Sequence, residues 1–364
     1  SGPALYAEDL QVGQAMFLRG GFTATGSGGS GAVRLRDAHI GGGLWCDGAK
    51  LRNDSGPALE ATSLQVGQHM YLSGGFTATA STVGGAVSLF RAHIGGGLDC
   101  SRAKLRNDSG PALYAEDLQV GQHMYRSGGF TATGSGDVAV DLTSVRVGGT
   151  LRFDPARLEH AADSRRRIAV DGLTYAGVPD RVSVRDWLRL LREGTLRYAA
   201  QPYQQLAAGA RALGHEREAR EILMAQRDDQ LARGDSSWLE QSWGRITKVT
   251  LGYGYQPWRA LLFLFAVVAL SCVLAVVLGS HGALAQADST AAARPCTVIQ
   301  QVSVGLDLNL PVGTSLARVG CGLARDPGSA TAAGLAAAGW GLRLLAWAFA
   351  ALFIAGFTNA VRKT

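Results

Sequence analysis

Residues 1–5 read SGPAL, residues 10–14 read LQVGQ and residues 20–25 read GGFTAT, and these segments decide the fold because they return twice. The second copy begins at Ser55 and the third at Ser109, so each begins 54 residues after the one before. Repetition at a fixed period is typical of similar units stacked on one another. The first part of the chain is therefore expected to be a repeat domain. Because Ser1 begins inside the repeat pattern, we expect the natural protein to extend further upstream.

A shorter period lies inside each copy. Aliphatic residues followed by glycine recur every 26 to 28 residues, and the aliphatic members are Val12, Ile40, Val66, Ile94, Val120 and Val147. Around each pair, apolar and polar residues alternate, which is typical of short strands with one buried face. One unit of about 27 residues buries too little apolar surface to fold alone. Residues 1–178 are therefore predicted to form a parallel β-solenoid of about six coils with a cap. A β-propeller or sandwich is the alternative, but a propeller blade needs about 40 to 45 residues.

Several side chains in the repeats invite chemical interpretations. Residues 26–31 match GxGxxG, but no helix pattern follows, as a dinucleotide site requires. The paired histidines and cysteines recur two coils apart, about 9 to 10 Å by the usual strand spacing, too far to share a metal ion or a disulfide. We expect an outer, solvated histidine ladder and small buried cysteines. These residues are His39 with His93, His69 with His123, and Cys46 with Cys100.

Residues 181–248 are predicted to form a helical connector. The segment QPYQQLA at residues 201–207, followed by Gly214, Ala219 and the expected apolar contact residue Leu223, has the spacing of one tetratricopeptide-like helical hairpin. A peptide-binding groove needs about three such hairpins. The hairpin is therefore interpreted as a rigid adaptor between the repeats and the rest of the chain.

Residues 249–364 are predicted to form a membrane domain with two spans. Residues 258–279 and 340–360 are apolar, and 22 residues at about 1.5 Å each cross a hydrocarbon core of about 30 Å. Basic residues concentrate before the first span and after the second, which places both termini in the cytoplasm. These residues are Arg245, Lys248, Arg259, Arg362 and Lys363. The loop 280–339 is then external.

Within the external loop, Cys296 and Cys321 are the only cysteines, so a disulfide between them is expected where such bonds persist. Residues 302–311 alternate apolar and polar side chains, which predicts a strand, with a re-entrant pore segment as the alternative. Four aromatic residues near the span ends are predicted interfacial anchors. These are Tyr253, Tyr255, Trp258 and Trp340.

The glycine-rich coils, the helical hairpin and the segments GYGYQPW (252–258) and AGFTNAVRK (355–363) together resemble a family of actinobacterial membrane proteins. Members of that family are commonly labelled membrane-associated oxidoreductases, and the label implies redox activity. The resemblance also implies a bacterial plasma-membrane location. No flavin, nicotinamide, haem or dithiol motif is present for that activity to be placed on. The coils also look like those of bactofilins, β-helical proteins that polymerise end to end.

The sequence thus predicts a mixed β and α protein: an N-terminal solenoid, a helical connector and two transmembrane helices. The net charge of +6 is scattered, which does not favour nucleic acid as a partner. No nucleophile, base, metal ligands or phosphate loop converge, so no catalytic residue and no cofactor is predicted. The leading interpretation is a membrane-anchored scaffold that binds the lipid bilayer and presents a cytoplasmic rod for self-assembly or a protein partner. The alternatives are an oligomeric pore or signalling effector and a membrane oxidoreductase.

Overall fold

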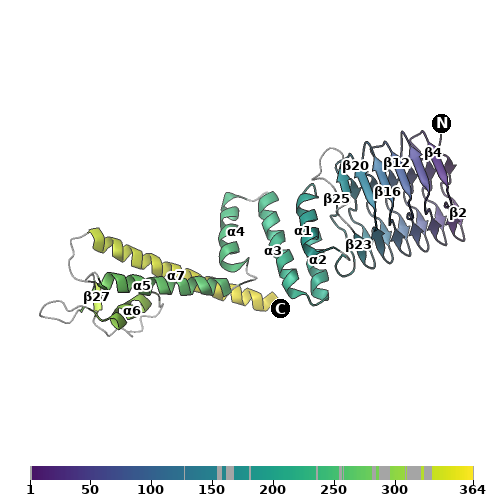
Figure 1. The fold of residues 1–364 in the computed structure, drawn as a ribbon. Coiled ribbons are helices and arrows are strands. Elements are labelled where there is room, and N and C mark those ends of the chain that lie inside the picture. The colour runs from purple at the N-terminus through teal and green to yellow at the C-terminus, as the bar shows by residue number, and fades with distance from the viewer. Residues whose placement is uncertain are drawn as a thin grey trace. The chain divides into compact units, whose positions relative to one another are not determined.

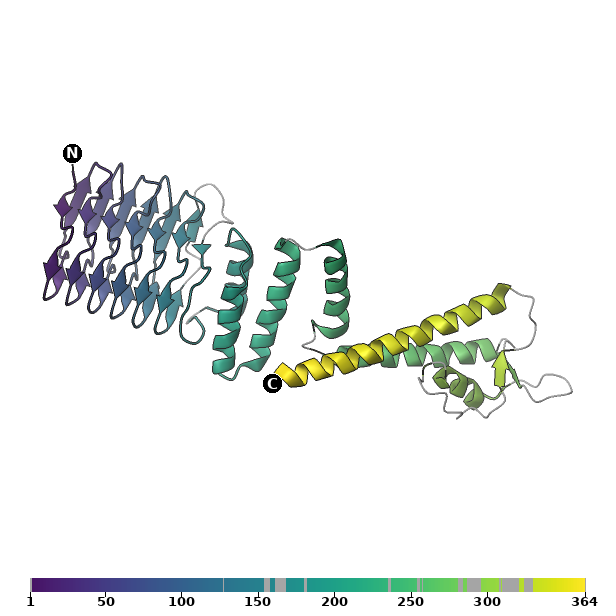
Figure 2. The same ribbon diagram turned by 180° about the vertical axis from the view of Figure 1, so that it is seen from behind.

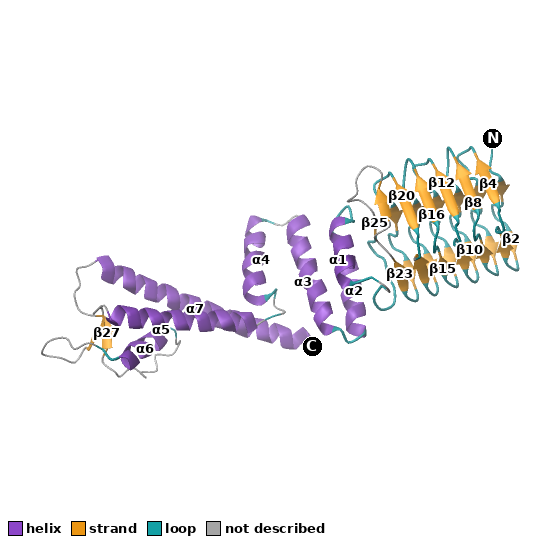
Figure 3. Ribbon diagram, in the orientation of Figure 1, coloured by secondary structure: helices purple, strands orange, loops and turns teal. Residues whose placement is uncertain are grey.

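The computed structural model describes residues 2–126, 128–153, 158–160, 168–179, 182–234, 237–253, 256, 258–280, 284–286, 296–307, 309, 321–323 and 330–363. The chain divides into two compact units, Ser1–Asp235 and Ser236–Thr364. The first unit contains short strands and three helices, and the second is mainly helical (Figure 1, Figure 3).

The strands of the first unit form four parallel sheets, one along each side of a solenoid. The first sheet contains β1 (Leu5–Tyr6), β5 (Val33–Arg34), β9 (Leu59–Glu60), β13 (Val87–Ser88), β17 (Leu113–Tyr114), β21 (Val140–Asp141) and β25 (Ile168–Ala169). The second contains β2 (Gln11–Val12), β6 (His39–Ile40), β10 (Gln65–Val66), β14 (His93–Ile94), β18 (Gln119–Val120) and β22 (Arg146–Val147).

The third sheet contains β3 (Met16–Phe17), β7 (Leu44–Trp45), β11 (Met70–Tyr71), β15 (Leu98–Asp99), β19 (Met124–Arg126) and β23 (Leu151–Phe153). The fourth contains β4 (Thr23–Gly26), β8 (Lys50–Asn53), β12 (Thr77–Ala80), β16 (Lys104–Asn107), β20 (Thr131–Gly134) and β24 (Leu158–His160). The coils stack in chain order, so the predicted parallel β-solenoid is confirmed (Figure 3).

The aliphatic residues of the repeated aliphatic-glycine pairs form one column in the second sheet. Each pairs in register with the next, from Val12 with Ile40 through to Val120 with Val147. From Ile40 onward the column is buried. The predicted alignment of these residues is therefore confirmed, and it sets the stacking of the other three sheets.

The glycine that follows each aliphatic residue allows two coils to approach closely. The amide of Gly67 donates to the carbonyl of Ile40 at 2.8 Å. A Cβ on Gly67 would lie 2.3 Å from the carbonyl oxygen of Gly41, and one on Gly121 would lie 2.2 Å from that of Gly95. Any side chain here would force the coils apart, which explains the repeated glycine.

Buried asparagines satisfy the backbone at one corner of the solenoid. Asn53 donates from Nδ2 to the carbonyls of Gly28 at 2.8 Å and Pro57 at 3.0 Å. Asn107, two coils further on, donates to the carbonyls of Thr82, Gly84 and Pro111. The asparagine side chains thereby donate hydrogen bonds to turn carbonyls that are not paired by the strands.

Helices α1 (Val184–Glu193) and α2 (Gln201–Ala212) cap the last coil. Gln201 accepts from the amide of Gly172 at 3.1 Å and donates to the carbonyl of Leu173 at 2.9 Å. Gln205, one helical turn later, donates to the carbonyl of Tyr175 at 2.7 Å. These side chains form hydrogen bonds with backbone groups of the last coil, which has no following coil to pair with them.

Helix α3 (Glu216–Arg233) packs antiparallel to α2 to form the predicted hairpin. Tyr203, Leu206, Ala207 and Ala219 are buried there as expected, with Ile222. The predicted contact residue Leu223 is only half-buried. Ile222 and Leu223 follow Ala219 by three and four residues, so both lie within about 60° of its direction, and Ile222 takes the more buried position.

The second unit contains α4 (Trp238–Leu251), α5 (Trp258–Ser280), β26 (Leu284–Gln286), α6 (Val298–Asp307), β27 (Cys321–Leu323) and α7 (Ala330–Lys363). Helices α5 and α7 lie side by side (Figure 1, Figure 2), and Phe263 stacks on Phe349 with ring centroids 5.4 Å apart. Trp258–Ser280 and Ala337–Thr358 are long and apolar enough to cross a membrane. The two predicted spans thus coincide with helices of suitable length.

The strand predicted over residues 302–311 is wrong for its described part, because Val298–Asp307 form α6. The buried residues are Gln301, Gly305 and Asn309, four positions apart, as on one helix face. Gly305 lies against the backbone of Cys272 in α5, where a Cβ would come within 2.6 Å. The alternation in the sequence reflects exposed apolar residues around this close helix contact.

Candidate interaction faces and membrane segment

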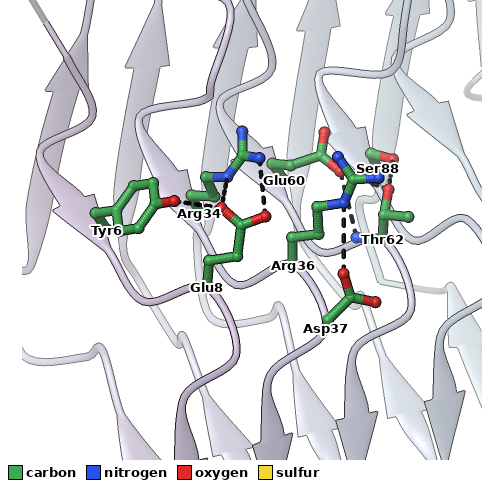
Figure 4. A network of polar contacts seen from close by, with 8 residues as sticks. All are labelled: Tyr6, Glu8, Arg34, Arg36, Asp37, Glu60, Thr62 and Ser88. Carbon is green, nitrogen blue, oxygen red and sulfur yellow. Dashed lines mark hydrogen bonds and ion pairs between the residues drawn. The ribbon is translucent and has the colours of Figure 1, made fainter.

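The outward face of the first sheet carries a polar network (Figure 4). The Tyr6 hydroxyl donates to the carboxylate of Glu8. Arg34, one coil further, donates to the same carboxylate from Nε at 2.9 Å and from Nη2 at 3.1 Å. The guanidinium, followed by the tyrosine, holds the pKa of Glu8 below its usual value, and the bond to Glu8 raises the pKa of Tyr6.

The same arrangement returns along this face in altered form. Thr62 donates to Glu60 at 2.5 Å, and its hydroxyl lies 3.4 Å from that of Ser88 (Figure 4). Tyr114 donates to Glu116 at 2.5 Å. Each carboxylate is thus bonded to a hydroxyl two residues away in the same coil. This geometry fastens the turn that follows each strand and leaves no paired acid and base poised for catalysis.

An aromatic file runs along the outward face of the third sheet. Phe17, Trp45 and Tyr71 are in register. The ring centroids of Phe17 and Trp45 are 6.2 Å apart, and those of Trp45 and Tyr71 are 4.1 Å apart. The guanidinium of Arg19 lies 4.8 Å from the centroid of Phe17. Further along, Arg152 lies over Tyr125 at 5.2 Å. Stacked rings with adjacent guanidinium groups form a flat surface suited to binding planar or apolar groups.

The sequence reasoning missed this file because it followed inward positions. Aligning the coils on their glycines would have shown that Phe17, Trp45 and Tyr71 each follow an inward aliphatic residue or methionine. Outward residues carry no hydrophobic period of their own, so only the coil alignment places them together.

The histidines have two roles rather than one. His39 and His93 are exposed and outward as predicted, and His39 Nδ1 lies 3.2 Å from Oε1 of Gln65. The solvated-ladder prediction is wrong for His69 and His123, which are half-buried. Their Nδ1 atoms accept from the amides of Gly97 at 2.8 Å and Thr150 at 3.1 Å, so they fasten turns between coils. Among the described residues, no three His, Cys, Asp or Glu side chains are grouped to hold a metal.

The fourth sheet presents threonine and basic residues on alternate coils. One file runs through Thr23, Lys50, Thr77, Lys104 and Thr131. The neighbouring file contains Arg52 and Arg106, which pair with Asp54 at 3.0 Å and Asp108 at 2.9 Å. The basic charge is thus partly neutralised by the aspartate two residues later, and the face is hydrophilic.

A cavity of about 330 Å³ lies where the last coil meets the helical cap. Asp171 and Arg197 are the charged residues of its lining, which is otherwise mainly apolar and includes Ile168, Leu191 and Tyr198. One carboxylate and one guanidinium can orient a small ligand, but the lining offers no nucleophile with a neighbouring base.

The predicted interfacial anchors are partly described. Trp258 begins α5 and is 56% exposed, and Trp340 in α7 is 65% exposed with the guanidinium of Arg343 at 5.8 Å from its ring. Tyr253 follows the left-handed residue Gly252 that ends α4. Tyr255 lies outside the described residues. Their anchoring role stays a prediction.

The cysteines fall into two groups. Cys46, Cys100 and Cys272 are not disulfide-bonded, and burial raises the pKa of Cys46 to about 12. Cys296 is disulfide-bonded. Cys321 lies in β27, which pairs antiparallel with β26, but its side chain is outside the described part of the structure. The specific bridge from Cys296 to Cys321 therefore stays a prediction.

No family model, curated protein or solved structure matches this chain. The resemblance to actinobacterial proteins and the redox label therefore remain expectations from the sequence. The fold itself defines the class: a parallel β-solenoid with a helical cap, in a chain that carries two helices able to cross a membrane.

Proposed function

We propose that this protein is a membrane-anchored scaffold whose solenoid presents a repeating surface for self-assembly or for a protein partner. The observation that carries the proposal is the stacked register of outward side chains, which repeats the same faces along the solenoid, in a chain with two apolar helices. In this proposal both termini and the solenoid are cytoplasmic, and the spans cross a bacterial plasma membrane.

The chemistry of the outward faces supports binding rather than catalysis. Glu8, Glu60 and Glu116 are each bonded to a neighbouring hydroxyl, so these carboxylates are committed to the fold. The aromatic file of Phe17, Trp45 and Tyr71 places three stacked rings among the described outward side chains of the solenoid. Aromatic residues beside arginine are enriched where proteins bind one another.

Self-assembly can be tested on the full chain in detergent by measuring its mass over a range of concentrations. We expect oligomers that Trp45→Ala weakens at least severalfold. Val83→Ala is the matched control, since Val83 is 89% exposed but lies in a turn away from the aromatic file. A strict monomer at every concentration that also retains no protein partner would overturn the proposal.

A second candidate, an oligomeric pore, is favoured by the position of α6. This helix returns along α5, with Gly305 against Cys272 and Gln301 against Gly279. Gln301 in α6 and Asn309, two residues after the helix, are buried in that contact. Asn309 donates to the carbonyl of Gly305 at 2.8 Å, and its Oδ1 lies 3.5 Å from the hydroxyl of Ser271. Buried polar groups beside a membrane-crossing helix are typical of ion pathways or of polar helix contacts.

The pore is tested by ion flux from liposomes that contain the full chain. Asn309→Leu should abolish flux, whereas Ile299→Ala should not, because Ile299 is 83% exposed on the opposite side of α6. Liposomes that stay impermeable to sodium, potassium and chloride under all conditions would remove this candidate.

A further inference from the structure

Helix α4 has sharply defined ends. Ser237 accepts from the amide of Glu240 at 3.3 Å, and Glu240 accepts from the amide of Ser237 at 3.1 Å, which is a capping box. Gly252 ends the helix in the left-handed region, with φ of 53°. Local signals therefore fix this helix, independently of packing along its length.

One side of α4 is apolar and unburied. Trp238, Leu239, Trp243, Ile246 and Val249 fall within less than half of the helix circumference at 3.6 residues per turn. Each of these side chains is at least 51% exposed. The buried residues of α4 are Gly244, on the opposite side, and Thr250, in the last turn. A helix in water would not keep two tryptophans uncovered without a partner for that side.

The charges of α4 suit an anionic surface. Arg245 and Lys248 are exposed, and Arg259 follows just inside α5. The one acidic residue of α4, Glu240, is engaged in the capping box. Basic residues beside tryptophan and aliphatic side chains are the composition of helices that lie in a membrane interface.

The direction of α4 also fits a position along a membrane surface. Six residues, 252–257, separate α4 from Trp258, where the first apolar helix begins. Figures 1 and 2 both show α4 running across the direction of α5 and α7, which belong to the same unit. If α5 crosses the membrane, α4 lies along its surface, next to the exposed apolar residues of the span.

We propose that α4 is an interfacial helix whose apolar side enters the acyl boundary of the membrane and whose basic residues bind anionic phospholipid headgroups. This inference rests on the membrane anchoring proposed above. It assigns to α4 the role of holding the chain between solenoid and span flat on the lipid surface. We therefore assign the apolar side of α4 to contact with lipid, and not with a second copy of the chain.

The test uses the full chain in nanodiscs, with the three cysteines that form no disulfide replaced as Cys46→Ala, Cys100→Ala and Cys272→Ala. A spin label is placed at Trp243→Cys on the apolar side or, as the matched control, at Lys248→Cys on the polar side. A third label at Phe265→Cys reports on α5, where Phe265 is 62% exposed. Accessibility to oxygen and to a water-soluble nickel chelate is then measured in phosphatidylcholine, with and without phosphatidylglycerol.

We expect the label at 243 to be severalfold more accessible to oxygen than to nickel, and the label at 248 to show the reverse. Phosphatidylglycerol should strengthen this contrast, and high salt should weaken it. Equal nickel access at both positions, with Phe265→Cys still lipid-exposed, would overturn the interfacial helix alone. Exclusion of both reagents at 243, independent of lipid composition, would assign the face to a second copy. Nickel access at 265 would instead overturn the membrane anchoring itself.

Discussion

Nε of Arg192 in α1 lies 2.6 Å from Oδ1 of Asp229 in α3, and Oδ2 of the same carboxylate accepts from the hydroxyl of Tyr203 in α2 at 2.5 Å. The Asp229 side chain is 4% exposed, whereas that of Arg192 is 51% exposed. One carboxylate thus joins all three helices of the cap. Burial, followed by the bond to Asp229, raises the pKa of Tyr203.

Asp229→Ala should loosen the cap, because it leaves the buried Tyr203 hydroxyl without its acceptor. We expect a loss of about 2 to 3 kcal/mol, the cost typical of a hydrogen bond to a charged group. Hydrogen exchange in peptides from residues 184–233 measures this loss of stability in the three helices. Asp229→Asn keeps an acceptor and should lose less. Unchanged protection in Asp229→Ala would show that packing alone holds the three helices.

Gly67→Ala should destabilise the solenoid, because its Cβ would lie 2.3 Å from the carbonyl oxygen of Gly41. Displacing a backbone strand to relieve such a contact costs about 2 to 3 kcal/mol. Gly84→Ala is the control, since its nearest neighbour is 3.9 Å away, and it should change stability by less than about 1 kcal/mol. Thermal unfolding, monitored by circular dichroism, compares the melting temperatures of the two variants. Equal melting temperatures would contradict the close approach of the coils.

Alkaline pH should destabilise the solenoid partly through Cys46, because burial raises the pKa of its thiol from 9.0 to about 12. The folded state then keeps a proton that the unfolded state loses. The stabilisation is complete below pH 9 and is lost as pH rises from 9 towards 12. Each pH unit between these limits should cost the wild-type chain about 1.4 kcal/mol more than Cys46→Ala, or about 4 kcal/mol in all. Parallel pH profiles for the two chains would rule out this contribution.

Thiol counting tests the predicted bridge. The chain has five cysteines, of which Cys46, Cys100 and Cys272 are not disulfide-bonded. A maleimide should therefore label three sites in the denatured, unreduced chain and all five after reduction. Peptide mapping should recover Cys296 linked to Cys321. A fourth label before reduction, or linkage of Cys296 to another chain, would contradict the intramolecular bridge.

The inward side of the solenoid was predictable because burial imposes a periodic pattern on the sequence. Val12 and its successors repeat at nearly constant intervals, and the glycine beside each marks the close approach of coils. The spacing of Tyr203, Leu206 and Ala219 likewise revealed the hairpin of α2 and α3.

The outward faces and α6 were not predictable in the same way. Whether His69 meets the amide of Gly97 depends on the register between coils, which sequence spacing fixes only to within a residue or two. In α6, apolar residues alternate although Gln301 and Gly305 face α5, so the period of two was misleading. The aromatic file was visible only once Phe17, Trp45 and Tyr71 had been placed in one sheet.

The glycines and asparagines that fix the coil stack recur with the same phase in the first two copies, and this has an evolutionary consequence. Removing residues 55–108 would join Asp54 to Ser109, the junction that Asp108 already makes with Ser109 and that Asp54 makes with Ser55. Unequal recombination between copies would thus shorten or lengthen the solenoid in increments of two coils, about 10 Å. No increment introduces a novel peptide sequence or shifts one face onto another, so the length of the solenoid can be inherited as a variable separate from the chemistry of its faces.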